Sequence, residues 1–160
     1  MAEERFEVSR TIPATPADIF AVLRDPAGHV AIDSSGMLQS HTGEPATKSG
    51  DTFTIHMDRE SLGDFPLGRY DVEVTIGAYE VDREINWTIF GVVRPPIGHV
   101  YGYLLEPTGG GTKVTSYYDW SDIHPEWRAK NIFPIISELA LKATLGILER
   151  TLRAKGQTQD

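Results

Sequence analysis

The sequence predicts a single α+β domain over residues 1–160, in which a curved antiparallel sheet of about six to seven strands wraps around a long C-terminal helix, with two short helices after the first strand. Three observations support this fold class. A strand pattern opens the chain, apolar and polar residues then alternate repeatedly between residues 37 and 121, and a helical pattern runs on from Pro134 to Lys155. One amphipathic helix cannot cover a flat sheet of this width, so we expect the sheet to bend around it.

The N-terminal forty residues predict the first strand and the two short helices. Residues 6–12 alternate as a half-buried strand does, with Phe6, Val8, Arg10 and Ile12 in one phase. In "TPADIFAVLRDP", the threonine can cap a helix, the first proline suits its first turn, and the second proline is expected to end it. The stretch "AGHVAIDSSG" then predicts a second short helix or a turn-rich segment.

The middle of the chain predicts the remaining strands. The loop "PTGGG" supplies the glycines that a tight hairpin between the last two strands requires. The predicted strands cover residues 37–41, 51–58, 69–76, 85–89, 100–106 and 113–121.

Apolar residues in the last segment recur at helical spacing and predict the face that packs on the sheet. A glycine at position 146 weakens the helix, and we interpret it as a point of close approach to the sheet. The predicted stripe contains Ile132, Ile136, Leu139, Ala143 and Ile147.

Composition excludes several classes of protein. The chain has no cysteine, so disulfides, thiolate metal sites and cysteine nucleophiles are ruled out. A net charge of -8 argues against nucleic-acid binding, which needs a basic surface. The N-terminus "MAEERFEVSR" has no apolar run, and no window offers the roughly 20 apolar residues of a spanning helix, so we expect a cytoplasmic protein without integral membrane association.

The alternation within the last strand decides how its one aspartate is interpreted. Val114 and Trp120 form the more apolar set and are placed inward, which turns Asp119 outward unless a bulge reverses the phase.

The five histidines are scattered along the chain without the spacing of metal ligands, so we expect no metal site and no cofactor. Arg10 has inward phase, and either its guanidinium lies in solvent or it anchors a ligand carboxylate.

Three stretches resemble the helix-grip fold of the START and pollen-allergen superfamily, in particular the bacterial SRPBCC or polyketide cyclase/dehydrase-like proteins. They are "FEVSRTIPATPADIFAVLRDP", "IDSSGMLQS" and "GGGTKVTSYYDWS", and the resemblance covers nearly the whole chain. It implies an internal cavity, in which relatives either bind hydrophobic ligands or cyclise polyketides. The superfamily shares the cavity rather than one chemistry.

We therefore predict that the protein binds or transports a hydrophobic small molecule, lipid-like or polyketide-like, in an internal cavity. One alternative is a polyketide cyclase or dehydratase that uses the same cavity. Another is a protein-interaction module that uses the outer sheet and the basic C-terminal helix. The oligomeric state, monomer or homodimer, stays open. The predicted cavity residues are Met37, Phe53, Ile55, Tyr70, Val74, Trp87, Ile89, Tyr103, Tyr118, Trp120, Ile136, Leu139, Ala140 and Ala143, with Arg10 as a possible polar anchor.

Overall fold

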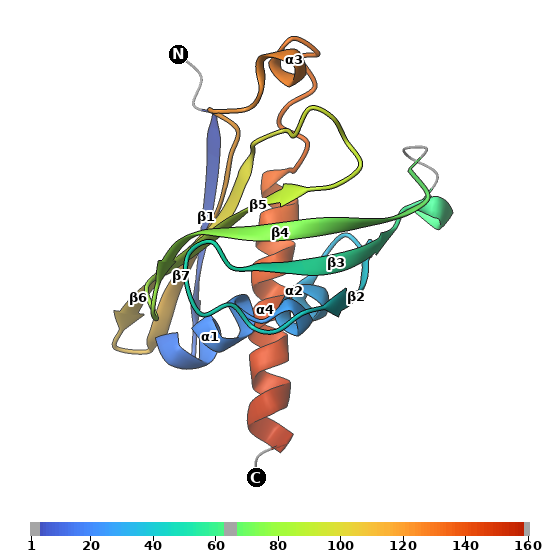
Figure 1. The fold of residues 1–160 in the computed structure, drawn as a ribbon. Helices are drawn as coiled ribbons and strands as arrows, with labels where there is room; N and C mark the ends of the chain where they lie inside the picture. Colours follow the sequence, from blue (N-terminus) through green and yellow to red (C-terminus); the bar gives the residue numbers. More distant parts are fainter. Residues whose placement is uncertain (1–3, 63–66, 159–160) are drawn as a thin grey trace.

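Seven strands form one antiparallel sheet in a computed structural model that describes residues 4–62 and 67–158 (Figure 1). The sheet has the order β1-β7-β6-β5-β4-β3-β2, so that every strand except β1 lies beside its neighbour in sequence. This confirms the predicted sheet, while the extreme ends of the predicted 1–160 domain lie outside the described residues. The strands are β1 (Arg5–Ile12), β2 (Leu38–Thr42), β3 (Thr52–Asp58), β4 (Arg69–Glu80), β5 (Glu84–Phe90), β6 (Val100–Thr108) and β7 (Gly111–Asp119).

Two short helices follow β1, as predicted, and lie at one end of the sheet (Figure 1). Thr15 caps α1 (Pro16–Leu23), because its hydroxyl accepts a hydrogen bond from the Asp18 amide at 3.1 Å. Asp25 caps α2 (Pro26–Ile32) in the same way, through the Ala27 amide at 2.9 Å. The second proline of "TPADIFAVLRDP" therefore begins the next helix, three residues after α1 has ended.

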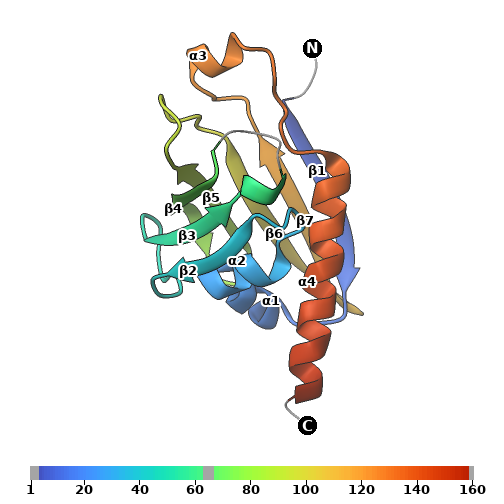
Figure 2. The same cartoon turned by 90° about the vertical axis from the view of Figure 1, so that its right-hand side faces the viewer.

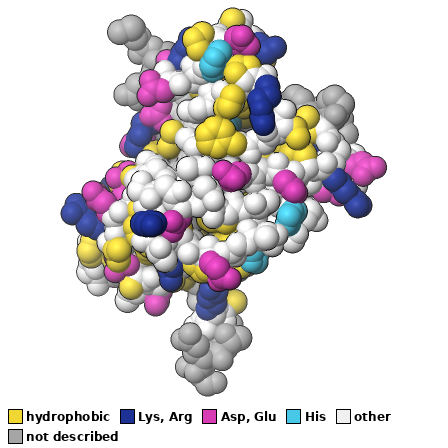
Figure 3. All heavy atoms as spheres, in the orientation of Figure 1, with side chains coloured by type: hydrophobic (Ala, Val, Ile, Leu, Met, Phe, Trp, Pro, Cys, Tyr) yellow, Lys and Arg dark blue, Asp and Glu magenta, His cyan; other side chains and the backbone are white. Residues whose placement is uncertain are grey.

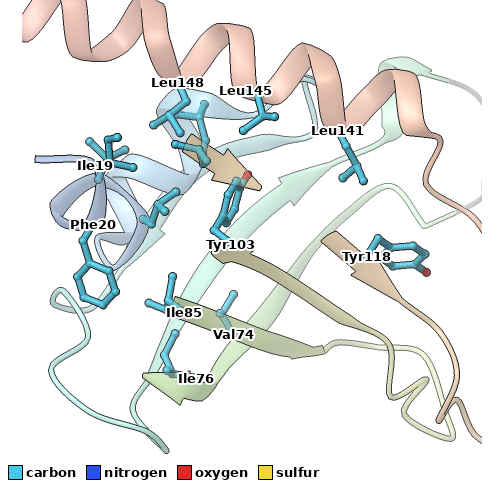
Figure 4. Packing of buried hydrophobic residues seen from close by; sticks show 14 of the residues in the cluster. Ile19, Phe20, Val74, Ile76, Ile85, Tyr103, Tyr118, Leu141, Leu145 and Leu148 are labelled. Carbon is cyan, nitrogen blue, oxygen red and sulfur yellow. The ribbon is translucent and has the colours of Figure 1, made fainter. Parts of the chain in front are cut away.

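The remaining helices are η1 (Glu60–Leu62), α3 (Pro125–Arg128) and α4 (Glu138–Thr158). The long helix α4 lies against β1, β7 and α2, on the concave side of the sheet (Figure 2). Leu141, Leu145 and Leu148 form a row along α4 that faces the sheet, with Tyr103 opposite this row (Figure 4). All three leucines are buried, so they supply the helix side of the core. No helix among residues 4–62 and 67–158 is both long enough and apolar enough to cross a membrane.

The predicted inward face of the C-terminal helix was wrong for Ile132, Leu139 and Ala143, of which Ile132 is 50% exposed and precedes α4. Leu139 is 75% exposed and Ala143 is exposed, whereas Leu141 and Leu145 are buried. The prediction counted the helical phase from Ile132 and Ile136, but α4 begins only at Glu138. Residues outside a helix do not determine which side chains share a face within it. Here the extrapolation assigned residues of the solvent-exposed side to the inward face.

The interpretation of Gly146 was also wrong. A Cβ atom built at this position would meet no heavy atom within 4 Å, so the glycine does not mark a close approach to the sheet. Gly28 in α2 does mark one, between the two short helices. A Cβ atom there would lie 1.9 Å from the backbone oxygen of Val22 in α1.

Candidate functional site

The concave face of the sheet carries a continuous belt of aromatic rings. Register places Trp87 of β5 beside Tyr101 of β6, and Tyr101 beside Tyr118 of β7. The ring centroids of Trp87 and Tyr101 are 6.4 Å apart, and those of Tyr101 and Tyr118 are 5.0 Å apart. His29 of α2 extends the belt at 4.4 Å from the Trp87 ring, and Trp120 continues it at 5.7 Å from the Tyr118 ring. The alternation of the strands therefore turns these rings to one surface.

One end of this face is less completely buried than the other, and it is called the loop end below. It lies next to the β5–β6 loop (residues 91–99) and to the α3–α4 segment (residues 129–137). Along β5, Ile85 is fully buried, but Trp87 and Ile89 keep partial exposure although they share its face. Along β4, Val74 is buried and Tyr70 is partly exposed. The helices and their leucines thus cover the far end of the concave face more completely than they cover the loop end.

Apolar side chains also reach the surface around the loop end. Ile132 and Ile135 of the α3–α4 segment are about half exposed, and Leu139 follows them at the start of α4. Hydrophobic side chains gather on the surface where Figure 1 places α3 and the β5–β6 loop (Figure 3). An apolar surface beside a partly open concave face is typical of a binding site for an apolar partner.

The residues predicted to line a cavity divide into two groups, in addition to the two on the wrong helix face. The first group is packed within the core and consists of Phe53, Ile55, Val74, Tyr103, Tyr118 and Trp120. The second group is partly buried against that core and consists of Met37, Tyr70, Trp87, Ile89 and Ile136. Ala140 is half-buried on α4. Only the second group is accessible enough to meet a ligand without movement of the core.

Two surface pockets that the described residues form lie elsewhere. One is formed by the start of α1 with the β4–β5 turn and the end of β6, and it includes Pro16 and Leu105. The other lies on the last turns of α4 around Thr151. Neither contains a residue that was predicted to line the cavity. Neither pocket is the internal cavity that the sequence predicted, and the candidate site is instead the partly exposed aromatic surface of the loop end.

Two histidines belong to the interior, which the sequence did not reveal. His29 is buried, and its Nε2 lies 2.7 Å from the Leu23 carbonyl oxygen, to which it donates. His99 is also buried, and its Nδ1 lies 2.6 Å from the Tyr118 hydroxyl. Burial lowers the pKa of each imidazole to about 4, so both are neutral at pH 7. A lone histidine in a loop or short helix gives no periodic signal, and the sequence could not place it inside.

The tyrosine hydroxyls of the belt stay protonated. Burial raises the pKa of Tyr101, the nearby Tyr70 raises it further, and the Arg59 guanidinium partly offsets both. Burial also raises the pKa of Tyr103 to about 12, although a hydrogen bond with Ser116 acts in the opposite direction and lowers it. The aromatic rings of the belt are thus uncharged, with a few hydroxyls and the Arg59 guanidinium at their border, which suits a mostly apolar molecule.

Arg10 does not enter this surface. Its exposed guanidinium pairs with Glu149 of α4, with 3.2 Å between Nε and the carboxylate oxygen. The structure agrees with the interpretation in which the guanidinium lies in solvent. Hydrogen bonding to Glu149 raises the pKa of Arg10, so the arginine acts as a surface link between β1 and α4.

Asp119 lies on the outer face of the sheet, as its strand parity predicted. Its carboxylate accepts hydrogen bonds from the Ser121 hydroxyl at 2.6 Å and from Arg5 at 3.4 Å. Partial burial alone would raise its pKa, but these bonds outweigh burial and lower it. Arg5 also lies 4.0 Å from the centre of the Tyr117 ring. Asp119 is therefore an ionised partner of Arg5 and not an acid in the aromatic belt.

A hydroxyl, an imidazole and a carboxylate line up on the outer face of β2, β3 and β4. The His56 Nε2 lies 2.7 Å from the Thr42 hydroxyl, and its Nδ1 lies 2.7 Å from the Asp71 carboxylate. This is the order of groups in hydrolase triads, but all three are on the solvent side of the sheet and neither surface pocket includes them. We interpret them as cross-strand bonds. Within the described parts of the chain, no three His, Asp or Glu side chains come together as a metal site requires.

Known proteins agree with this fold. Residues 3–153 match a family described as "Polyketide cyclase / dehydrase and lipid transport". Ms6760 from Mycobacterium smegmatis has a similar structure, with a TM-score of 0.68 and 13% identity over 95% of this chain and 92% of that one. A Rhodobacter sphaeroides protein gives a TM-score of 0.67 and 18% identity, with 96% and 94% coverage. The Aha1 dimer from Colwellia psychrerythraea gives a TM-score of 0.60 and 17% identity, over 95% of this chain and 96% of that one. The sequence matches no curated protein.

Proposed function

Because this chain belongs to the polyketide cyclase/dehydrase and lipid transport family, we propose that it binds an apolar small molecule against the aromatic surface of the loop end. The observation that supports this most strongly is the partial exposure of Trp87, Ile89 and Tyr70 on the concave face. Side chains of this kind normally lie in a core, and their exposure in water is unfavourable by roughly 25 cal/mol for each Å² of apolar surface. A ligand that covers them would recover this free energy.

The electrostatics of the site indicate the class of ligand. The imidazole of His99 is neutral at pH 7, and burial keeps the hydroxyl of Tyr101 protonated. Two carboxylates on the strands of the belt, Glu84 and Asp119, belong to the outer face with Tyr117 and Arg5. An uncharged molecule with a long apolar part therefore fits this surface better than a phosphate or a sugar does.

Native mass spectrometry of gently purified protein, followed by solvent extraction, tests the proposal without a choice of ligand. We expect a copurifying apolar molecule that dissociates on denaturation. A protein that is ligand-free in every preparation and that also fails to bind the uncharged fluorophore N-phenyl-1-naphthylamine would contradict the proposal.

Replacement of Ile89 by asparagine should weaken binding of N-phenyl-1-naphthylamine about ten-fold. The substitution puts an amide where the apolar ligand is expected, and an unpaired amide in apolar surroundings costs about 1–2 kcal/mol. Fluorescence titration measures the effect.

The matched control is Thr88→Asn. Thr88 is the preceding residue on β5, is also half-buried, and has the opposite parity, so it lies on the outer face. Its substitution should leave the dissociation constant within about two-fold of the wild-type value. Equal losses for the two variants would show that the concave face is not the binding surface.

A further inference from the structure

His99 is 1% exposed, yet one of its ring nitrogens has no partner among residues 4–62 and 67–158. Its Nδ1 contacts the Tyr118 hydroxyl, but its Nε2 is buried and makes no hydrogen bond to any residue that the structure describes. A buried polar group that is left unpaired costs about 1–3 kcal/mol, so native proteins seldom leave one without a purpose. The nitrogen is therefore a buried polar group for which the described residues supply no partner.

The hydrogen bond between Tyr118 and His99 determines which atom of His99 carries the proton. Tyr118 is fully buried, so the proton of its hydroxyl needs an acceptor within the protein, and Nδ1 of His99 lies 2.6 Å from the hydroxyl oxygen. The tyrosine thus donates its proton to Nδ1 of His99. A neutral imidazole holds one proton, so here the proton is on Nε2, which becomes a donor without an acceptor.

The surroundings of His99 are aromatic. Its ring lies 5.1 Å from the Tyr101 ring and 6.0 Å from the Phe133 ring, measured between centroids. Because Nδ1 faces the Tyr118 hydroxyl, Nε2 lies on the side of the imidazole that is turned away from that hydroxyl. Phe133 belongs to the α3–α4 segment, which borders the loop end, and Tyr101 belongs to the aromatic belt. The donor therefore adjoins the surface on which the ligand is expected.

We propose that the Nε2–H group of His99 is the polar anchor of the ligand and donates a hydrogen bond to a neutral acceptor oxygen, such as the carbonyl of a ketone, ester or quinone, on an otherwise apolar molecule. This inference rests on the proposed function and adds the chemical class of the ligand. A neutral imidazole among aromatic rings offers no charge to balance a carboxylate, so a carbonyl is preferred to an acid of the same length.

Two ligands of the same shape test this anchor in the intact protein. 2-Decanone and 2-methyl-1-decene differ in that an oxygen replaces a methylene group. Both are titrated as competitors of N-phenyl-1-naphthylamine. The affinity of each ligand is divided by its partition coefficient from water into hexane, which removes the different costs of leaving water. On this corrected scale we expect the ketone to bind about ten-fold more tightly than the alkene, because one hydrogen bond to a group otherwise left unpaired is worth about this factor. The carbonyl ¹³C resonance of bound 2-decanone should also be shifted downfield of its position in hexane.

The double variant His99→Phe/Tyr118→Phe removes the donor and its partner together, so that neither hydroxyl nor imidazole is left unpaired. It should bind both ligands with nearly equal corrected affinity and abolish the ¹³C shift. The control His29→Phe also removes a buried histidine, but one whose Nε2 already donates to Leu23, and it should keep the preference for the ketone.

The outcomes separate this inference from the proposed function. If the wild-type protein binds ketone and alkene equally on the corrected scale, the anchor is wrong and apolar binding stands. If neither ligand displaces the fluorophore, both proposals fail. Should the double variant not fold, as judged by its circular dichroism, the affinity ratio and the ¹³C shift of the wild-type protein still decide the question.

Discussion

Replacement of Gly28 by alanine is expected to lower the free energy of unfolding by about 3 kcal/mol or more. The new Cβ atom would lie 1.9 Å from the Val22 carbonyl oxygen and 2.8 Å from its carbonyl carbon. These are backbone atoms of α1, so no side-chain rotation can relieve the overlap, and the two short helices have to separate. Urea denaturation followed by circular dichroism measures the change.

Gly146→Ala is the matched control, because it is also a helical glycine. An added Cβ atom there meets nothing within 4 Å, and alanine favours the helix over glycine. This variant should gain about 0.5–1 kcal/mol. Opposite signs for the two substitutions are the expected result. A Gly28→Ala protein as stable as the wild type would mean that α1 and α2 do not pack as described.

Acid should destabilise the protein strongly between pH 6.5 and pH 4. Burial lowers the pKa of His29 and His99 to about 4 in the folded state, whereas an unfolded histidine titrates near 6.5. The unfolded chain therefore binds more protons in this window, so stability is complete above pH 6.5 and falls as the pH decreases. The loss approaches about 2 kcal/mol for each histidine at pH 5. Urea midpoints at pH 7, 6 and 5 measure it.

Carboxylates contribute in a different window. Hydrogen bonds lower the pKa of Glu149 below its ordinary value, and its contribution is lost only as the pH falls below about 4.5. The loss between pH 6.5 and 5 can therefore be assigned to the histidines. The His99→Phe/Tyr118→Phe variant should lose part of this dependence, while His41→Gln, a change at an exposed position on β2, should keep it. Identical urea midpoints at pH 7 and pH 5 would contradict the burial of both histidines.

Alternation along the strands was sufficient to predict most of the sheet. The concave positions of Phe53, Ile55 and Val74 and the outward position of Asp119 follow directly from a period of two residues. The helix face could not be predicted in the same way. Its phase depends on where α4 begins, and nothing in the apolar pattern marks Ile132 as non-helical.

The centre of the candidate site was missed because it depends on contacts between distant segments. His99 and Tyr118 are 19 residues apart, and they meet only because β6 and β7 pair in one register. The α3–α4 segment then adjoins them through Phe133, whose ring lies 6.0 Å from the His99 ring between centroids. Of His99 and Tyr118, only Tyr118 was predicted to face inward. Where an internal cavity was predicted, the core residues pack against one another. The accessible part of the concave face is an aromatic surface that is partly exposed at its loop end.

The most direct test of the central claim is the position of the bound ligand. Isotope-filtered NOEs between ¹³C-labelled protein and unlabelled N-phenyl-1-naphthylamine report which side chains the ligand contacts. We expect cross-peaks to the methyl groups of Ile89 and Ile136 and to the Trp87 ring. Cross-peaks confined to Ala17 and Leu105 in the surface pocket, or to Ala154 on the last turns of α4, would contradict binding on the concave face.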